Sequence, residues 1–139
     1  MNEQNINPGI FGLGNPNNAY SQYFSGRSWL KMLTVERLVT ANVTFEAGCR
    51  RSPCRTNWHV HHKGGQILLV TAGRGWYQAY GEPPRSLKPG DVVNIPPEVK
   101  HWHGAAKDSS FAHIAIEVPA EGSSNEWLEP VSDEDYAKL

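Results

Sequence analysis

Hydrophobic and polar residues alternate strictly along positions 39–45. The odd positions carry the apolar side chains and the even positions the polar ones: Val39, Ala41, Val43 and Phe45 against Thr40, Asn42 and Thr44. Successive side chains of a β-strand point to opposite faces of its sheet. This period of two therefore predicts a strand with one buried face.

Short apolar or alternating segments recur along the rest of the chain between turns rich in Gly and Pro, at residues 29–33, 58–61, 66–72, 76–80, 92–95 and 111–118. Segment 66–72 is apolar on both faces, which predicts a strand covered on both sides. The Gly73-Arg74-Gly75 turn predicts a hairpin into 76–80, and Lys88-Pro89-Gly90-Asp91 has the residue order of a type II turn. Many short strands of this kind favour an all-β barrel or sandwich.

The chain divides into three parts. Residues 1–28 are rich in Asn, Gly and Pro and predict an irregular N-terminal arm, residues 29–120 hold the barrel strands, and residues 121–139 form a tail. Ser132 and Asp135 have the spacing of a capping box, which predicts a short C-terminal helix. A length of 139 residues is enough for one domain with one core.

The charge pattern excludes several classes of partner. The formal net charge is −1 and no basic stripe is present, so we expect no nucleic-acid partner. No apolar run approaches the ~18 residues of a membrane span. The first residues lack the basic and apolar regions of a secretory signal, so we expect a soluble cytoplasmic protein.

Both cysteines lie near a basic loop. Cys49 begins the loop Cys49–Arg55 and Cys54 lies near its end, and without an export signal we expect reduced thiols. A thiolate ligand or nucleophile is the alternative, because neighbouring arginines lower a thiol pKa. Neither cysteine has a base beside it in sequence, so this alternative is the weaker one.

Histidines concentrate in two short segments. Five of the six lie in Trp58–Gln66 and Lys100–His103. His59 and His61 fall on one face of a predicted strand, with Cα atoms about 6.5–7 Å apart, a spacing at which two imidazoles can bind one metal ion. The alternative is a histidine-rich loop without a metal. His62 faces the other way, which predicts a surface or interface residue.

The same segments carry the two sequence motifs of the cupins. The first is His-x-His, four residues, Gln or Glu, six residues and Gly, here His59, His61, Gln66 and Gly73. The second is Gly, five residues, Pro-x-Gly, two residues and His, here Gly90, Pro96 and His101, with Glu98 in place of the inner glycine. The opening glycine of the first motif, if it is Gly48, is followed by an insertion around Arg51–Arg55.

The chain also resembles the small bacterial manganese cupins with hydroxynitrile lyase activity, which are related to cupins named alongside carboxymuconolactone decarboxylase-like domains. The likeness runs through Trp58–His61, Gly65–Gln66, Val70–Trp76, Pro89–Val93, Lys100–Ala106 and His113–Ile116. It implies a double-stranded β-helix, or jelly-roll barrel. It also implies a metal-dependent lyase that cleaves cyanohydrins reversibly to cyanide and an aldehyde or ketone.

The resemblance implies a set of site residues. One divalent ion, Mn²⁺ by resemblance, is expected on His59, His61, Gln66 and His101; this neutral nitrogen and oxygen donor set also suits Fe²⁺, Co²⁺, Ni²⁺ or Zn²⁺. His113 is expected beside the ion, as a general base with a pKa near neutrality or as a satisfied core residue. The predicted pocket residues are Ala41, Val43, Phe45, His103 and Glu117, with His103 as an alternative ligand to His101.

Other activities remain open for this pattern, because one fold hosts many functions. One alternative is an O₂-using cupin dioxygenase or a metal-dependent decarboxylase-type enzyme. Another is a non-enzymatic cupin that binds a metal or a small ligand. In each case we expect a small-molecule ligand and a homo-oligomer, either a dimer or a tetramer.

Overall fold

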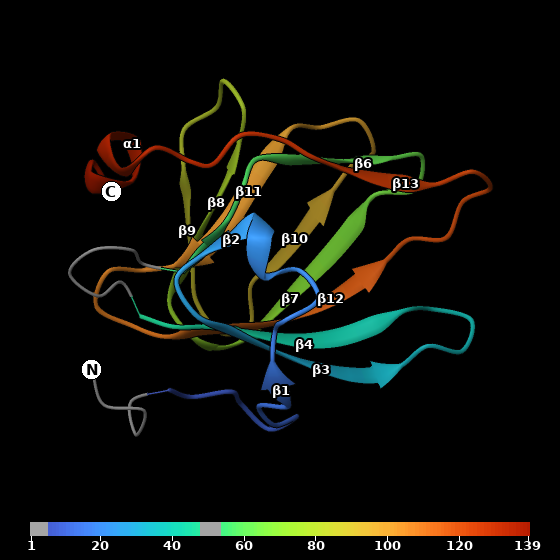
Figure 1. Cartoon of the computed structure of the whole chain (residues 1–139), viewed down its shortest axis with the longest axis horizontal. Helices are drawn as coiled ribbons and strands as arrows, with labels where there is room; N and C mark the ends of the chain where they lie inside the picture. The colour runs from blue at the N-terminus through green and yellow to red at the C-terminus, as the bar shows by residue number, and fades with distance from the viewer. Residues whose placement is uncertain (1–5, 48–53) are drawn as a thin grey trace.

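The computed structural model describes residues 6–47 and 54–139. Gly48, Cys49 and most of the predicted insertion around Arg51–Arg55 lie outside the described residues. Two antiparallel sheets face each other (Figure 1), which confirms the expected all-β barrel. Among the described residues, no helix has the length and apolar character needed to cross a membrane.

The first sheet has the strand order β1-β3-β4-β12-β7-β10. Its strands are β1 (Asn15–Pro16), β3 (Ser28–Thr34), β4 (Thr40–Phe45), β7 (Gln66–Gly73), β10 (Val92–Ile95) and β12 (Phe111–Glu117). The second sheet has the order β13-β6-β11-β5-β2, with β8 paired to β11 and β9 paired to β8. Its strands are β2 (Phe24–Ser25), β5 (Arg55–Thr56), β6 (His59–His62), β8 (Gly75–Ala79), β9 (Arg85–Leu87), β11 (His101–Ala105) and β13 (Ser124–Trp127).

The core lies between the two sheets. Its buried members come mainly from β4, β7, β9, β10, β11 and β12 and include Phe45, Leu68, Val93, Ile95, Ala105 and Phe111. One face of β7 is buried, whereas its other face, with Ile67 and Leu69, is only half-buried. The prediction of full cover on both sides of this strand is therefore correct for one face only.

Strand β4 is buried on both faces, although the alternating sequence predicted one. Asn42 and Thr44, on its polar face, are both fully buried. The N-terminal arm crosses this face, and the Asn42 amide donates hydrogen bonds to the carbonyl oxygens of Pro8 at 3.1 Å and Gly12 at 2.8 Å. A polar face is thus covered by backbone that supplies hydrogen-bond acceptors, which hydrophobicity alone does not reveal.

The predicted hairpin at Gly73-Arg74-Gly75 is wrong. Strand β7 pairs with β10 and β12, whereas β8 pairs with β9 and β11 in the opposite sheet. The turn therefore carries the chain from one sheet to the other, and β8 pairs locally with β9 instead. The type II turn is confirmed, because the Asp91 N–H donates to the Lys88 carbonyl at 3.0 Å and Gly90 has φ +95°.

We expect Gly73→Ala to be among the more destabilising glycine substitutions. Gly73 has φ +71°, and an added Cβ would lie 1.8 Å from the Ser110 carbonyl oxygen. The backbone strain and the clash together should cost about 3 kcal/mol of unfolding free energy or more. Gly90→Ala is the matched control: it has positive φ but open space around the Cβ, so only about 1–2 kcal/mol should be lost. Equal urea midpoints for the two variants would contradict the clash.

The C-terminal tail packs back onto the barrel. A short helix, α1 (Asp133–Ala137), begins after Ser132, whose hydroxyl accepts from the Asp135 N–H at 3.1 Å, so the predicted cap and helix are confirmed. Arg55, almost fully buried, reaches Asp133 at 2.8 Å and lies over the Tyr136 ring. Strand β13 was not predicted, and it follows β12, which had been expected to be the last strand.

Candidate metal centre

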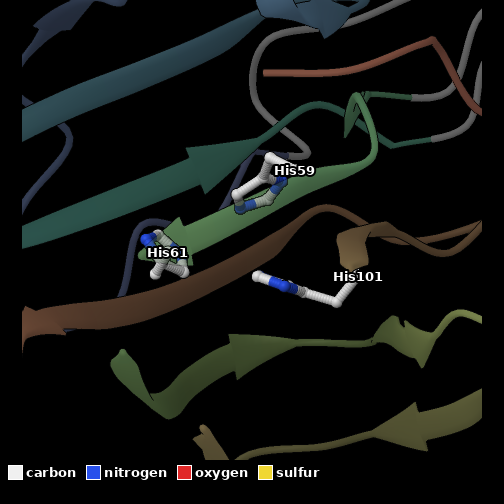
Figure 2. Close-up of side chains that lie close together, drawn as sticks. All are labelled: His59, His61 and His101. Atoms are coloured by element: carbon white, nitrogen blue, oxygen red, sulfur yellow. The ribbon is translucent and has the colours of Figure 1, made fainter. Parts of the chain in front are cut away.

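Two paired strands bring three histidines together. His59 and His61 lie on the same face of β6, and His101 begins β11 directly opposite His59. One ligand atom of each ring lies within 4.8 Å of the others (Figure 2). In the sequence 39 residues lie between His61 and His101. The antiparallel pairing of β6 with β11 brings the two histidines close together.

Each of these rings is fixed through its Nδ1 atom. His59 Nδ1 bonds to the Asn57 carbonyl at 2.9 Å, His101 Nδ1 to the Val99 carbonyl at 2.9 Å, and His61 Nδ1 to Asn125 Oδ1 at 2.7 Å. Since these partners are oxygen acceptors, each Nδ1 carries the proton and each Nε2 keeps its lone pair. The Nε2 atoms of His61 and His101 are buried without a hydrogen-bond partner. Lone pairs left unsatisfied in this way fit a metal ion.

Gln66, the fourth predicted ligand, begins β7 in the facing sheet. Its side chain lines the same cavity as His59 and His61. The Nε2 atom donates to Glu117 Oε1 at 2.6 Å, whereas Oε1 is buried without a partner. The amide oxygen is therefore the one atom of Gln66 available to an ion.

Burial keeps His59 and His101 neutral. Desolvation, with His101 nearby, lowers the pKa of His59 well below its usual 6.5, and desolvation lowers the pKa of His101 to about 4. A neutral imidazole is the form that binds a metal. A divalent ion held only by imidazoles and an amide would keep its double charge and act as a strong Lewis acid.

A cavity of about 360 Å³ opens beside these residues. Ala41 and Val43 contribute to its apolar wall, and His103, His113 and Glu117 contribute polar atoms. Phe45 is not among the lining residues. It lies behind the wall, fully buried, with its ring 5.8 Å from His103 and 5.3 Å from His113.

His103 and His113 form a hydrogen-bonded pair. His113 Nε2 lies 3.2 Å from His103 Nδ1, and both rings are buried. Two imidazoles joined in this way share one proton between them. Desolvation lowers the pKa of His113 to about 3 and that of His103 well below its usual value. The expectation that His113 titrates near neutrality is therefore wrong; both rings are neutral at working pH.

The metal-free protein should lose stability as the pH falls below about 6.5. Imidazoles of the unfolded chain titrate near 6.5, whereas the folded pKa values of His101 and His113 are about 4 and about 3. Between these values the unfolded chain binds more protons, so the free energy of unfolding falls as the pH falls. From pH 6.5 to 5.5 each of the two histidines should remove about 1 kcal/mol. Urea unfolding in chelator at both pH values measures this loss. The free energy of unfolding of His113→Leu should fall less between the two pH values, because one of the two histidines is absent.

His62 lies outside the cluster. It is partly exposed and bridges two acids, with Nδ1 at 2.5 Å from Glu98 and Nε2 at 2.7 Å from Glu126. The hydrogen bonds that the ring donates to Glu126 and Glu98 raise its pKa. Cys54, the described cysteine, is buried, and desolvation raises its pKa, opposite to the lowering expected from neighbouring arginines.

Two residues of β13 contact the cluster and were not predicted as site residues from the sequence. Asn125 holds His61, as described above, and the Trp127 ring stacks on His59 at 4.6 Å. Tyr23, from the N-terminal arm, also stacks on Trp127, with ring centroids 4.6 Å apart. Segment 124–127 has one apolar residue in four, so its sequence gives no sign of a strand beside the site.

Comparison with known proteins identifies the family. Residues 41–117, which contain the three histidines and Gln66, match the model of the cupin domain. The chain belongs to the cupin family. This cupin is 46% identical over 98 residues to an (R)-mandelonitrile lyase from Granulicella tundricola, covering 70% of each chain. It is 25% identical over 79 residues to an acireductone dioxygenase from Bacillus pumilus, covering 54% of this chain and 42% of that protein.

The fold of this cupin also matches a solved structure closely. A cupin-like protein from Thermotoga maritima superposes with a TM-score of 0.82 at 45% identity, covering 93% of this chain and 95% of that chain. The match extends beyond residues 41–117, so it includes most of the arm and tail strands that flank the site. The double-stranded barrel expected from the two sequence motifs is confirmed.

Proposed function

We propose that this cupin is a metal-dependent hydroxynitrile lyase, which splits a cyanohydrin reversibly into a carbonyl compound and cyanide. The 46% identity to an (R)-mandelonitrile lyase supports the reaction class. One structural observation carries the proposal: three of the donor residues, His59, His61 and Gln66, line the same cavity as the buried His103–His113 pair. We further propose Mn²⁺ as the ion on His59, His61, Gln66 and His101.

The residues around the cavity have different roles in the proposed reaction. A divalent ion in this donor set supplies Lewis acidity toward the substrate oxygen or cyanide. The histidine pair takes the hydroxyl proton, the electrons of the O–H bond form the C=O bond, and the electrons of the C–C bond leave with cyanide. Burial lowers the pKa of His113, so the pair is unprotonated before the reaction. It accepts the hydroxyl proton and returns it to the departing cyanide, which leaves as HCN. Ala41 and Val43 provide an apolar surface for the remainder of the substrate.

Steady-state cleavage of mandelonitrile by the pure protein tests the proposal. We expect turnover that EDTA abolishes and Mn²⁺ restores. No turnover by protein shown to contain one Mn²⁺ per chain would contradict the lyase assignment. Metabolite binding without turnover would favour a ligand-binding cupin.

A cupin dioxygenase is the second candidate. The weaker similarity to an acireductone dioxygenase favours it, and an ion held by three imidazoles and one amide keeps open positions that suit O₂. Oxygen uptake with a catechol or a diketone by the Fe²⁺-loaded protein distinguishes this activity from the lyase. We expect no uptake above that of the metal-free protein.

We also propose a homo-oligomer. Exposed apolar side chains cluster around the connection between β3 and β4, at Met32, Val35, Leu38 and Val39. A second copy of the chain would remove this surface from water. Analytical ultracentrifugation should give a dimer or tetramer mass, and a monomer at micromolar concentration would contradict it.

A further inference from the structure

Glu117 fixes the orientation of the Gln66 amide. The two residues lie directly opposite each other where β12 pairs with β7. An ionised carboxylate only accepts hydrogen bonds, so the NH₂ group of Gln66 must face Glu117, 2.6 Å away. The amide oxygen then points away from Glu117, and it is buried with no partner in the protein.

Glu117 also places a negative charge beside neutral donors. Its second oxygen lies 3.8 Å from His61 Nδ1, so one carboxylate is close to two of the four proposed ligands. Asn125 is the closer partner of that ring, at 2.7 Å, which leaves the Gln66 amide as the principal contact of Glu117. A charge at this place attracts a divalent cation without occupying a coordination position.

We propose that Glu117 is a positioning residue of the metal centre, which turns the Gln66 oxygen toward the ion and offsets part of its charge. Without the carboxylate the amide is free to turn over and present its NH₂ group, which cannot bind a cation. This inference rests on the metal centre of the proposed function and not on the lyase reaction. It therefore concerns how tightly the ion is bound, whatever the ion catalyses.

Titration of metal-free protein with Mn²⁺ by calorimetry tests the role of Glu117. Glu117→Gln keeps the size of the side chain and loses the charge, and it should weaken Mn²⁺ binding about tenfold. Glu117→Leu loses the hydrogen bond as well and should weaken binding up to about a hundredfold. Glu121→Gln removes the same charge from an exposed position of the tail and should stay within about twofold of the wild type.

A double variant separates positioning from a general effect on folding. Gln66→Glu combined with Glu117→Gln exchanges the amide and the carboxylate, which restores both the charge and the hydrogen bond. We expect its Mn²⁺ affinity to return to within about threefold of the wild type, because the pair again supplies one oriented oxygen and one negative charge. Circular dichroism confirms that each variant is folded.

The outcomes are distinct. Weaker Mn²⁺ binding in both Glu117 variants, with recovery in the double variant, supports the inference whether or not the protein cleaves mandelonitrile. Wild-type affinity in Glu117→Gln and Glu117→Leu overturns it and leaves the proposed lyase intact. A wild-type protein that binds no Mn²⁺ overturns both.

Discussion

His101→Ala is expected to abolish stoichiometric Mn²⁺ binding and to lower lyase kcat/KM by about 10³-fold or more, a loss of about 4 kcal/mol in transition-state stabilisation. His101 is the histidine that β11 contributes to the cluster, and its Nε2 atom is buried without a hydrogen-bond partner. Its removal leaves two imidazoles on one strand and the Gln66 amide from the facing sheet. Metal analysis of the purified variant and steady-state kinetics in excess Mn²⁺ measure the two losses.

His62→Ala is the matched control for this substitution. His62 lies next to His61 in sequence, but its ring nitrogens bond to Glu98 and Glu126 rather than joining the cluster. This variant should keep one Mn²⁺ per chain and most of the wild-type activity. Equal metal loss in the two variants would mean that binding follows histidine content and not the geometry of the cluster.

The second large effect is expected at His113. Replacing this buried imidazole by Leu removes one member of the pair proposed to accept the proton, and it should lower kcat 10²- to 10⁴-fold, roughly the contribution of general acid–base catalysis. Mn²⁺ should still bind at one ion per chain, because His113 is not one of the clustered ligands. Pre-steady-state and steady-state assays with mandelonitrile measure kcat, and metal analysis verifies loading.

Packing around His113 requires its own control. Phe111 lies two residues away on β12, and its ring packs 5.4 Å from the His113 ring. Phe111→Leu disturbs the same part of the core without removing a proton acceptor, so its kcat should stay within about tenfold of the wild type. A His113→Leu variant as active as Phe111→Leu would exclude His113 from proton transfer and leave His103 as the remaining candidate.

Two strands that border the site could be predicted from local sequence. Alternation predicted β4, and the spacing of His59 and His61 on β6 placed two imidazoles on one face. Joining His101 to them depended on the two sequence motifs, because local periodicity does not specify which strands pair. The family match over residues 41–117 then confirmed the fold that those motifs implied.

What the sequence did not reveal depends on contacts between distant segments. Gly73-Arg74-Gly75 has the composition of a hairpin, yet the Arg74 N–H bonds to the Ser110 carbonyl while the chain crosses between sheets. Asn125 and Trp127 lie in a polar segment whose strand forms because β6 offers an unpaired edge. The pKa of His113 depends on complete burial, which no neighbouring residue in sequence indicates.

Anomalous diffraction at the manganese edge, from crystals grown with Mn²⁺, tests the central claim most directly. That claim is that three imidazoles from one sheet and one amide oxygen from the other hold a single divalent ion. The structure predicts one strong peak per chain, within coordination distance of Nε2 of His59, His61 and His101 and of Oε1 of Gln66. A peak elsewhere, or no peak beside these atoms at saturating Mn²⁺, would contradict it.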